Sequence, residues 1–229
     1  MDSVYTKLEQ RALGLLVKSQ EQYSDSRVIV LLAGPPGSGK STIAAQVVYR
    51  INAMRGAPIA KVLPMDGFHY SRAFLDTLPN HAEAHARRGA HWTFDGRGVV
   101  EMVKRLHATR KCPFTTLYIP SFDHDIKDPV FDAIEISPSV KIVIIEGNWL
   151  LYDQDPWNQI AKHADDTWFV DVDPRLALQR VAKRHVASGI EDTFEAAVTR
   201  ARNNDMKNGD EIRGGLIQPN ITVESIEDA

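Results

Sequence analysis

The chain has 229 residues, of which 43% are hydrophobic and 25% are charged, and its formal net charge is −3. This length and composition suit one globular domain with a buried core and argue against wholesale disorder. The slight negative charge argues against a general nucleic-acid-binding protein, which usually contains a strongly basic domain.

The cysteine content indicates the cellular compartment, and the length of the apolar stretches indicates whether the chain can enter a membrane. The single cysteine, Cys112, cannot form an intrachain disulfide, which fits a reducing compartment. Residues 1–22 lack the apolar core of a signal peptide, and no window approaches the ~18 apolar residues of a membrane span. We therefore expect a cytoplasmic protein that has neither a membrane nor a nucleic acid as a partner.

The first half of the chain alternates helical and extended patterns. Residues 3–22 carry apolar side chains at helical spacing, which predicts an amphipathic helix. Residues 28–32 form a continuous apolar, β-branched run, which is typical of a strand buried on both faces. A glycine-rich loop follows, and then a helix over about 40–53, a short strand over 62–65 and a helix over 98–107.

The second half continues this alternation. Residues 114–119, 140–145 and 167–172 predict three more strands. Asp173-Pro174 then supplies an N-cap and a first-turn proline for a helix that extends to Ser188-Gly189. Strands that alternate with helices imply a mostly parallel sheet with right-handed crossovers.

A phosphate-binding loop follows the first predicted strand. Residues 34–41 match the pattern G-x-x-x-x-G-K-[ST] in full, between a strand and a helix. The glycines let backbone N–H groups point at phosphate oxygens, and the helix N-terminus adds positive potential. We expect Lys40 to bridge the β- and γ-phosphates and Ser41 to bind Mg²⁺. The predicted nucleotide contacts are Gly34, Pro35, Pro36, Gly37, Ser38, Gly39, Lys40, Ser41 and Thr42.

These elements predict one α/β domain over residues 1–229 with the three-layer sandwich of P-loop NTPases. A mostly parallel central sheet would carry helices on both faces, and residues 174–210 would form a helical lid. Ligands bind at the carboxyl ends of the strands in such sheets. The P-loop, Asp66, residues 121–124 and Glu146 should therefore meet at one edge of the sheet.

Two carboxylates follow predicted strands. Asp66 ends the strand over 62–65, where a kinase acting on an alcohol needs a carboxylate to orient the hydroxyl and take its proton. An aspartate before a glycine is also a common turn pair, so a structural role for Asp66 is the alternative. Glu146 ends the strand over 140–145, the usual place for an acid that organises Mg²⁺ in a P-loop protein.

Basic residues mark the helix after Asp173-Pro174. Arg180 and Arg184 lie four residues apart and therefore share a face of that helix. Positive charge on a mobile lid would stabilise the transferring phosphoryl group, and the lid would exclude water. We expect Arg180 and Arg184 to close over the phosphates, with His185 as the alternative to Arg184.

A second unusual cluster covers Arg87 to Asp95, where paired arginines precede aromatic residues and an aspartate. Such a cluster could line an acceptor pocket. His81 and His85 lie nearby in the order H-A-E-A-H, which differs from the metal-binding order H-E-x-x-H. We therefore interpret this histidine pair as a feature of a surface helix.

These segments, in this order, resemble the superfamily of uridine kinases, phosphoribulokinases and pantothenate kinases. Residues 65–68, Met-Asp-Gly-Phe, resemble the strand-end D-G-F of pantothenate kinases, and residues 145–151 resemble the Walker-B-like I-E-G-x-x-x-L. Residues 121–124, Ser-Phe-Asp-His, resemble the acceptor segment of these enzymes. The resemblance implies ATP and Mg²⁺ as cofactors and Asp66 as the base. It also implies a set of acceptor-binding residues, namely Asp66, Phe68, Tyr70, Arg88, Asp123 and His124.

The acceptor itself stays open, because S-F-D-H replaces the tyrosine-serine-histidine of pantothenate kinases and D-G-F-H-Y replaces the D-S-F-Y of uridine kinases. The sequence predicts transfer of the γ-phosphoryl group of ATP to a hydroxyl of a nucleoside or of a similar ribosyl or sugar metabolite. A pantothenate or fructose-type kinase is the alternative with the same mechanism. Many such kinases self-associate, so a homodimer is the alternative to a monomer.

Two alternatives come from other enzyme classes. A regulatory P-loop NTPase would need no small acceptor, but the guanine-specificity motif N-K-x-D is absent from the sequence. A nucleoside monophosphate kinase would also use a basic lid. Its acceptor is a phosphate, however, and Asp66 in the base position would repel that phosphate.

Overall fold

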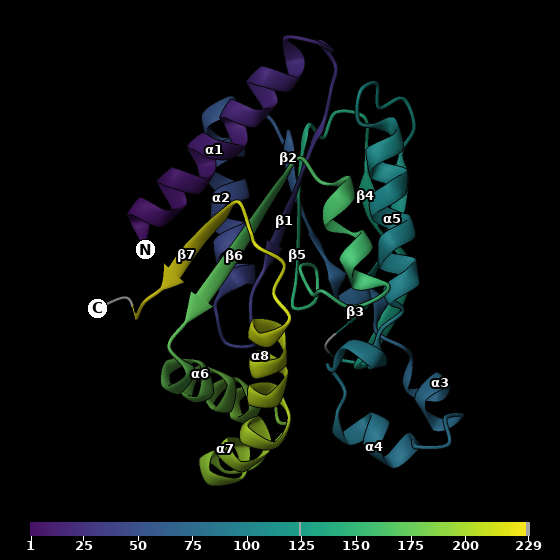
Figure 1. Ribbon diagram of the computed structural model, residues 1–229, viewed down its shortest axis with the longest axis vertical. Coiled ribbons are helices and arrows are strands. Elements are labelled where there is room, and N and C mark those ends of the chain that lie inside the picture. The colour runs from purple at the N-terminus through teal and green to yellow at the C-terminus, as the bar shows by residue number, and fades with distance from the viewer. Residues whose placement is uncertain (124, 228–229) are drawn as a thin grey trace.

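The computed structural model describes residues 1–123 and 125–227. At its centre is a sheet whose described strands follow the order β2-β5-β1-β6-β7 (Figure 1). Each neighbouring pair is parallel, as the sequence predicts. The strands are β1 (Val28–Ala33), β2 (Ala60–Pro64), β5 (Ile142–Gly147), β6 (Asp166–Val172) and β7 (Ile221–Ser225).

Helices cover both faces of this sheet, which completes the predicted three layers. α1 (Asp2–Gln20) and α2 (Lys40–Arg55) pack on one face, and α5 (Gly96–Thr109) packs on the other. Alternate side chains of β1 enter the two cores, because successive residues of a strand point to opposite faces. The core under α1 and α2 contains Val28, Val30 and Leu32, and the core under α5 contains Ile29 and Leu31.

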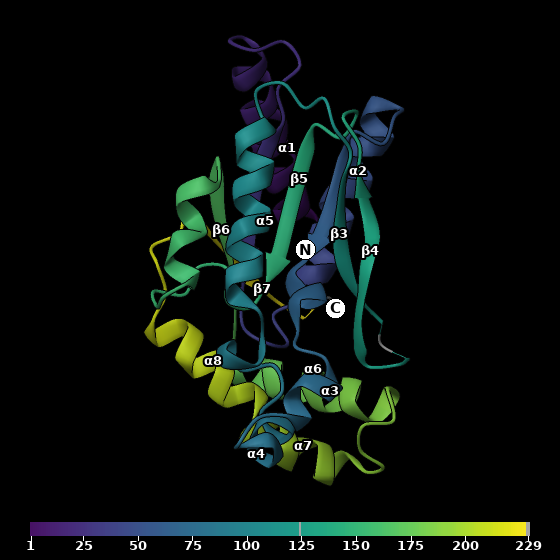
Figure 2. The ribbon, with the colours of Figure 1, turned by 90° about the vertical axis from the view of Figure 1, so that its right-hand side faces the viewer.

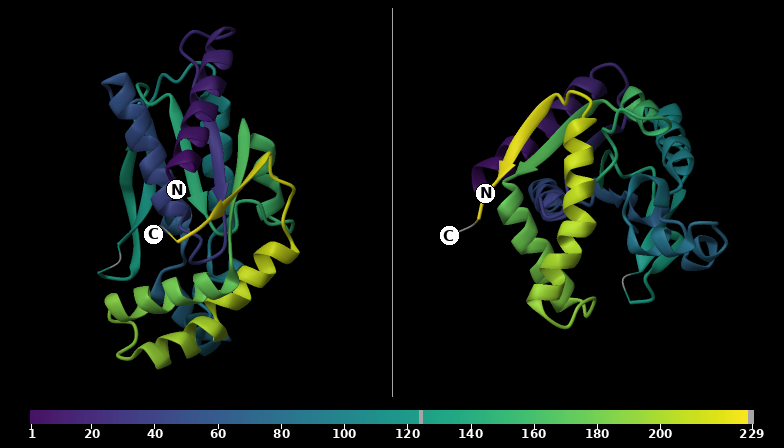
Figure 3. Two further views of the ribbon diagram at one scale, coloured as in Figure 1. Left: turned by 90° about the vertical axis from the view of Figure 1, so that its left-hand side faces the viewer. Right: turned by 60° about the horizontal axis from the view of Figure 1, so that its bottom comes forward.

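The other helices gather at the carboxyl end of the sheet (Figures 1 and 3). They are α3 (Arg72–Asp76), α4 (His81–Ala86), α6 (Pro174–Ala187), α7 (Phe194–Asn203) and α8 (Asp205–Gly214). Short 3₁₀ turns complete the described helices, at η1 (Met65–Phe68), η2 (His91–Thr93), η3 (Trp157–Gln159) and η4 (Ala161–His163). Among the residues that the structure describes, no helix combines the length and the apolar character that a membrane span requires.

The start of α6 follows the sequence prediction closely. The Asp173 carboxylate accepts hydrogen bonds from the backbone N–H groups of Arg175 and Leu176, as an N-cap does. The helix ends before Ser188, and Gly189 then adopts a positive φ of 62°. Together α6, α7 and α8 occupy the region that the sequence predicts as a lid, although α8 extends four residues beyond position 210.

One predicted strand belongs to a different sheet. The segment 114–119 is expected in the parallel sheet, but the strand begins later, as β3 (Leu117–Asp123), and pairs antiparallel with β4 (Asp128–Ile136). Figure 2 shows this hairpin beside the main sheet. The burial pattern explains the difference, because Leu117 and Ile119 are buried while Tyr118 is exposed. A strand with one solvated face suits a hairpin better than the interior of a parallel sheet.

Candidate active site

The P-loop connects β1 to α2 in a shape that requires glycine at several positions. Gly37 and Gly39 have φ values of 79° and 81°, in the left-handed region that other residues rarely adopt. A Cβ atom at Gly37 would lie 2.6 Å from the carbonyl oxygen of Ala177, and one at Gly34 would lie 2.7 Å from that of Val170. The loop is therefore packed tightly between the end of β6 and helix α6.

The loop offers hydrogen-bond donors that fit a phosphate group. Gly39 precedes α2 at the N-cap position and has no side chain, so it cannot cap the first N–H groups of the helix. The hydroxyl of Ser38 is buried and has no hydrogen-bond partner among the described residues. Free N–H groups at a helix N-terminus and an unpaired buried hydroxyl are the donors that an anionic ligand needs.

The strand order brings the predicted magnesium residues together. β1 and β5 are neighbours, and their register places Leu32 opposite Glu146, just before the P-loop. The hydroxyl of Ser41 donates a hydrogen bond to Oε1 of Glu146 across 3.1 Å. A hydroxyl and a carboxylate are the hard oxygen ligands that Mg²⁺ takes from proteins, with phosphate and water oxygens completing its shell. Ser41 and Glu146 therefore fit the metal that the sequence predicts.

Lys40, Glu146 and Asp66 form one electrostatic group. Burial raises the pKa of Glu146, Asp66 raises it further, and the Lys40 ammonium and the Ser41 hydroxyl oppose that shift. Burial lowers the pKa of Lys40, and the Glu146 and Asp66 carboxylates oppose that shift in turn. Asp66 thus lies close enough to Lys40 and Glu146 to affect the pKa values of both, as the predicted convergence at one sheet edge requires.

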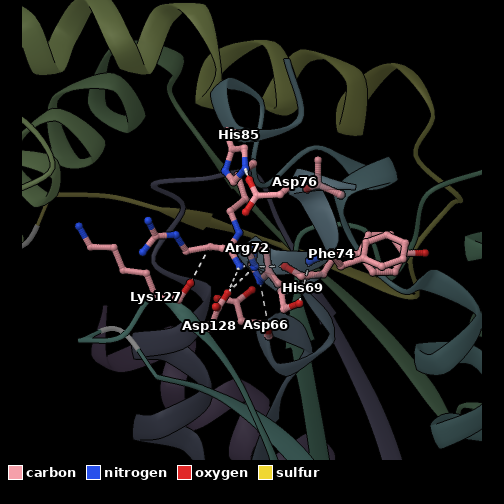
Figure 4. A network of polar contacts seen from close by, with 12 residues as sticks. Asp66, His69, Arg72, Phe74, Asp76, His85, Lys127 and Asp128 are labelled. Atoms are coloured by element: carbon pink, nitrogen blue, oxygen red, sulfur yellow. Dashed lines mark hydrogen bonds and ion pairs between the residues drawn. The ribbon is translucent and has the colours of Figure 1, made fainter. Parts of the chain in front are cut away.

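Asp66 lies in η1, directly after β2, and its backbone is fixed from two sides. β2 pairs with β5 so that Pro64 is opposite Glu146, which places Asp66 beside the predicted magnesium residues. A Cβ atom at Gly67 would lie only 2.1 Å from the carbonyl oxygen of Pro120, so η1 packs directly on β3. The Nδ1 atom of His69 also lies 2.8 Å from the Asp66 carbonyl oxygen, at hydrogen-bond distance (Figure 4).

The Arg88 side chain makes hydrogen bonds with other parts of the protein. Its guanidinium donates to the carbonyl oxygen of Tyr70 and to Oδ1 of Asp128, both across 2.8 Å, and to the carbonyl oxygen of Lys127 across 2.5 Å. It also lies over the ring of Phe122, 5.4 Å from the centroid. Arg88 therefore fastens the start of β4 to the segment that follows Asp66. Figure 4 shows Lys127 and Asp128 within this network.

The other predicted acceptor residues lie around Arg88 and its hydrogen-bond partners. Phe68 packs against the core under α5, and its carbonyl oxygen accepts a hydrogen bond from the N–H of Asp95 across 2.8 Å. Tyr70 is half-buried, and its burial and the nearby Asp95 raise the pKa of its hydroxyl. Asp123 uses Oδ1 to accept bonds from the N–H groups of Asp125 and Ile126 in the hairpin turn. His124 lies outside the described residues.

Asp95 and His85, two further members of the sequence clusters, have structural partners. The Asp95 carboxylate accepts a hydrogen bond from the N–H of Gly98 across 2.9 Å and caps α5. His81 and His85 lie on α4, as predicted, and Nε2 of His85 is 2.7 Å from Oδ1 of Asp76 (Figure 4).

Arg180 connects α6 to the phosphate loop. It donates to the carbonyl oxygen of Gly37 across 3.3 Å, to the hydroxyl of Ser225 across 2.8 Å and to the carbonyl oxygen of Ile226 across 2.9 Å. The guanidinium therefore lies beside the predicted nucleotide contacts, where α6 meets the end of β7.

Arg184 and His185 differ in what they offer the site. The Arg184 side chain is 64% exposed, and its charge adds to the lowering of the Lys40 pKa by burial and opposes the rise of the Glu146 pKa. The His185 side chain is only 6% exposed and lies 3.5 Å from Asp205. This geometry favours Arg184 over His185 as the residue that is free to contact a phosphoryl group.

The arrangement agrees with one family of known proteins. The model of the phosphoribulokinase / uridine kinase family matches residues 29–206, from β1 to the start of α8. The chain belongs to this family. It is therefore a P-loop kinase, and its fold and family place it among the phosphotransferases.

Relatives of this kinase family match nearly the whole chain. A candidate uridine kinase of Schizosaccharomyces pombe is 41% identical over 224 residues, which cover 98% of this chain and 92% of that protein. The crystal structure of YFH7 from Saccharomyces cerevisiae, a candidate P-loop kinase with a circular permutation, matches with a TM-score of 0.88 at 26% identity, covering 97% and 99% of the two chains. A candidate fructose transport system kinase from Silicibacter sp. TM1040 matches with a TM-score of 0.72 at 29% identity, covering 91% and 98%.

Sequence reasoning missed several residues that shape the site of this kinase. Asp128 anchors Arg88, and Ser225 anchors Arg180. Asn204 and Asn208 bind the segment around Arg88 from the far end of the chain. Polar residues in half-exposed strands and helix junctions carry no periodic pattern, so the sequence offers no feature that separates them from solvated surface residues.

Proposed function

We propose that this protein transfers the γ-phosphoryl group of ATP, in the presence of Mg²⁺, to a hydroxyl of a nucleoside or of a similar ribosyl or sugar metabolite. One observation carries the proposal: Lys40, Glu146 and Asp66 converge at the carboxyl edge of the sheet beside a P-loop. Lys40 and Glu146 belong to the donor half of a kinase site, and a second carboxylate beside them, Asp66, is what an alcohol acceptor needs.

Each side chain then has a defined task. The N–H groups of the P-loop and the Lys40 ammonium bind the β- and γ-phosphates, and Ser41 and Glu146 hold Mg²⁺, which when bound neutralises charge on the phosphates. Asp66 orients the acceptor hydroxyl and takes its proton as the new P–O bond forms and the bond to the β-phosphate oxygen breaks. Arg184 approaches from α6 and stabilises the charge on the transferring group.

The acceptor half is shaped by η1, the hairpin and the segment around Arg88. The names of two relatives, a candidate uridine kinase and a candidate fructose transport system kinase, motivate nucleosides and ketohexoses as the first acceptors to test. Pantothenate is the third, because of the D-G-F segment at residues 66–68. All three present an alcohol to Asp66 and need the same transfer chemistry.

A coupled ADP-release assay across nucleosides, pantothenate, ketohexoses and pentose derivatives tests this function. We expect at least one acceptor to raise ADP formation well above the basal rate and to yield a phosphate ester detectable by mass spectrometry. A flat response across the panel, with ATP hydrolysis alone, would instead support a regulatory NTPase without a small acceptor.

A further inference from the structure

The junction between α7 and α8 contacts the acceptor half of the site. We call residues 87–91 the acceptor loop. The guanidinium of Arg87 donates to Oδ1 of Asn204 across 3.1 Å and to Oδ1 of Asn208 across 2.8 Å. The Asn204 amide donates in return to the carbonyl oxygen of Arg88 across 3.0 Å. Both asparagines are buried, at 7% and 2% exposure, so their amides depend on the acceptor loop, and not on solvent, for hydrogen bonds.

A second contact ties the same helix to the end of the acceptor loop. The Glu211 carboxylate lies 3.2 Å from Nε2 of His91 and accepts a hydrogen bond from the Tyr152 hydroxyl across 2.9 Å. The indole N–H of Trp149 donates to the carbonyl oxygen of Gly89 across 3.0 Å. The loop is therefore positioned jointly by α8 and by the segment that follows β5.

The acceptor loop in turn reaches the surroundings of the proposed base. Arg88 donates to the carbonyl oxygen of Tyr70 and to the carboxylate of Asp128. The N–H of Tyr70 donates to the carbonyl oxygen of Thr93, just beyond the loop. The loop is therefore bonded directly to the segment that follows Asp66.

The opposite side of the junction faces the phosphate half. Asp205, the residue after Asn204, lies 3.9 Å from the Arg184 guanidinium and 3.5 Å from Nε2 of His185. Its charge also partly opposes the lowering of the Lys40 pKa that burial causes. Gly209 packs against Pro35 of the P-loop, where an added Cβ atom would be 3.4 Å from the Pro35 Cβ. Figure 3 shows α8 running beside α6 at this end of the molecule.

We propose that Asn204, Asp205 and Asn208 are positioning residues that couple the nucleotide half of the site to the acceptor half. Asp205 faces Arg184 and His185 of the lid helix at 3.9 Å and 3.5 Å, and the two asparagines hold the acceptor loop. Because the two sets of contacts start from neighbouring positions of one short helix, a nucleotide that draws Arg184 of α6 toward its phosphates shifts α8 and so tightens the acceptor loop. This inference rests on the proposed function, since it assumes that a nucleotide binds the P-loop.

Hydrogen–deuterium exchange with the non-hydrolysable ATP analogue AMP-PNP and Mg²⁺ tests the coupling without knowledge of the acceptor. In the unaltered protein we expect AMP-PNP to slow exchange both in the P-loop and in residues 86–92, the latter by about fivefold or more, the lower end of typical coupling. Asn208→Ala and Arg87→Ala remove the same contact from its two ends. Both variants should bind AMP-PNP and protect the P-loop but lose the protection of residues 86–92.

The control is Asn203→Ala, a neighbouring exposed asparagine on α7, which should behave as the unaltered protein does. Arg87→Ala leaves α8 intact, so it keeps the test valid if Asn208→Ala fails to fold. AMP-PNP binding without protection of residues 86–92 in the unaltered protein, or equal protection in both variants, overturns the coupling and leaves the proposed function standing. Failure of the unaltered protein to bind AMP-PNP overturns the proposed function itself.

Discussion

The donor and acceptor halves of this site are built in different ways. The donor half comes from adjacent parallel strands, so the P-loop and Glu146 meet through the register of β1 and β5. The acceptor half combines η1, the acceptor loop and the hairpin, three segments that are joined by side-chain hydrogen bonds such as those of Arg88. Backbone register makes the donor half a property of the fold, whereas individual side chains define the acceptor half.

This contrast suggests that a mutation can impair one half of the site and leave the other half intact. Among variants that keep the proposed base Asp66, the largest effect is expected on the donor side. Lys40→Met removes the ammonium from the buried group that it forms with Glu146 and Asp66, and we expect kcat to fall by ~10²–10³-fold, as for other preorganised charges. Steady-state ADP release measures the loss. Lys61→Met, a lysine on β2 that binds the Glu135 carbonyl oxygen, is the control, and a comparable loss there would contradict the assignment.

A variant of the acceptor half should have an intermediate effect, on the stability of the protein. Arg88→Met leaves the Asp128 carboxylate without its charged partner, and the pair is only 16% and 28% exposed. We expect a loss of about 2 kcal/mol in the free energy of unfolding, near the low end for a partly buried charge pair. Denaturant titration measures it, with the exposed Arg97→Met as control.

Arg88→Met also tests whether acceptor binding can be weakened without a loss of nucleotide binding. Because Arg88 contacts the hairpin and the Tyr70 carbonyl group, we expect its loss to raise KM for the acceptor while the affinity for AMP-PNP stays within about twofold. A matching loss of nucleotide affinity would show that the halves are not separable in this way.

The smallest effect concerns pH and Glu146. Burial raises the pKa of this carboxyl, so the folded protein takes up its proton before the unfolded chain does. As the pH falls through the raised pKa toward the ordinary value of ~4.3, the magnesium ligand is lost, while the contribution of Glu146 to folding stability increases. Activity and stability should therefore change in opposite directions within this window.

Glu146→Gln isolates this contribution. Its free energy of unfolding should lack the part of the pH dependence that Glu146 supplies, so the difference between the two proteins should shrink as the pH falls. Denaturant titrations at several pH values measure the difference. A constant difference across the window would show that the pKa of Glu146 is not raised in the folded protein.

The donor half could be predicted from the sequence because its elements follow short patterns of neighbouring residues. A β-branched run, a glycine-rich loop and a helix start within about 30 residues predict β1, the P-loop and α2 together. The Asp173-Pro174 pair likewise predicts the start of α6, and the structure confirms the cap. The ends of the predicted strands shifted, as with β5, which covers Ile142–Gly147 rather than residues 140–145, and the edge strand β7 (Ile221–Ser225) was not predicted.

The acceptor half could not be predicted in the same way. β4 carries the exposed Phe131 and several charged residues, so it lacks the alternation that would have revealed the partner of β3. The sequence predicts that Arg88 binds substrate, but a guanidinium can bind oxygens of the protein as well as those of a ligand, and only the three-dimensional structure shows the partners that it contacts. Asn204 and Asn208 lie more than 100 residues from Arg87 in the sequence, beyond the reach of any local pattern.

The central claim is that both halves meet at Asp66. The most direct test is Asp66→Asn, assayed with the best acceptor from the ADP-release screen, with Asp132→Asn on the exposed part of β4 as the control. We predict that phosphoryl transfer falls by ~10²–10⁴-fold, the usual loss on removing a general base, while AMP-PNP affinity stays within about twofold. Near-normal turnover by Asp66→Asn would contradict this account of the site.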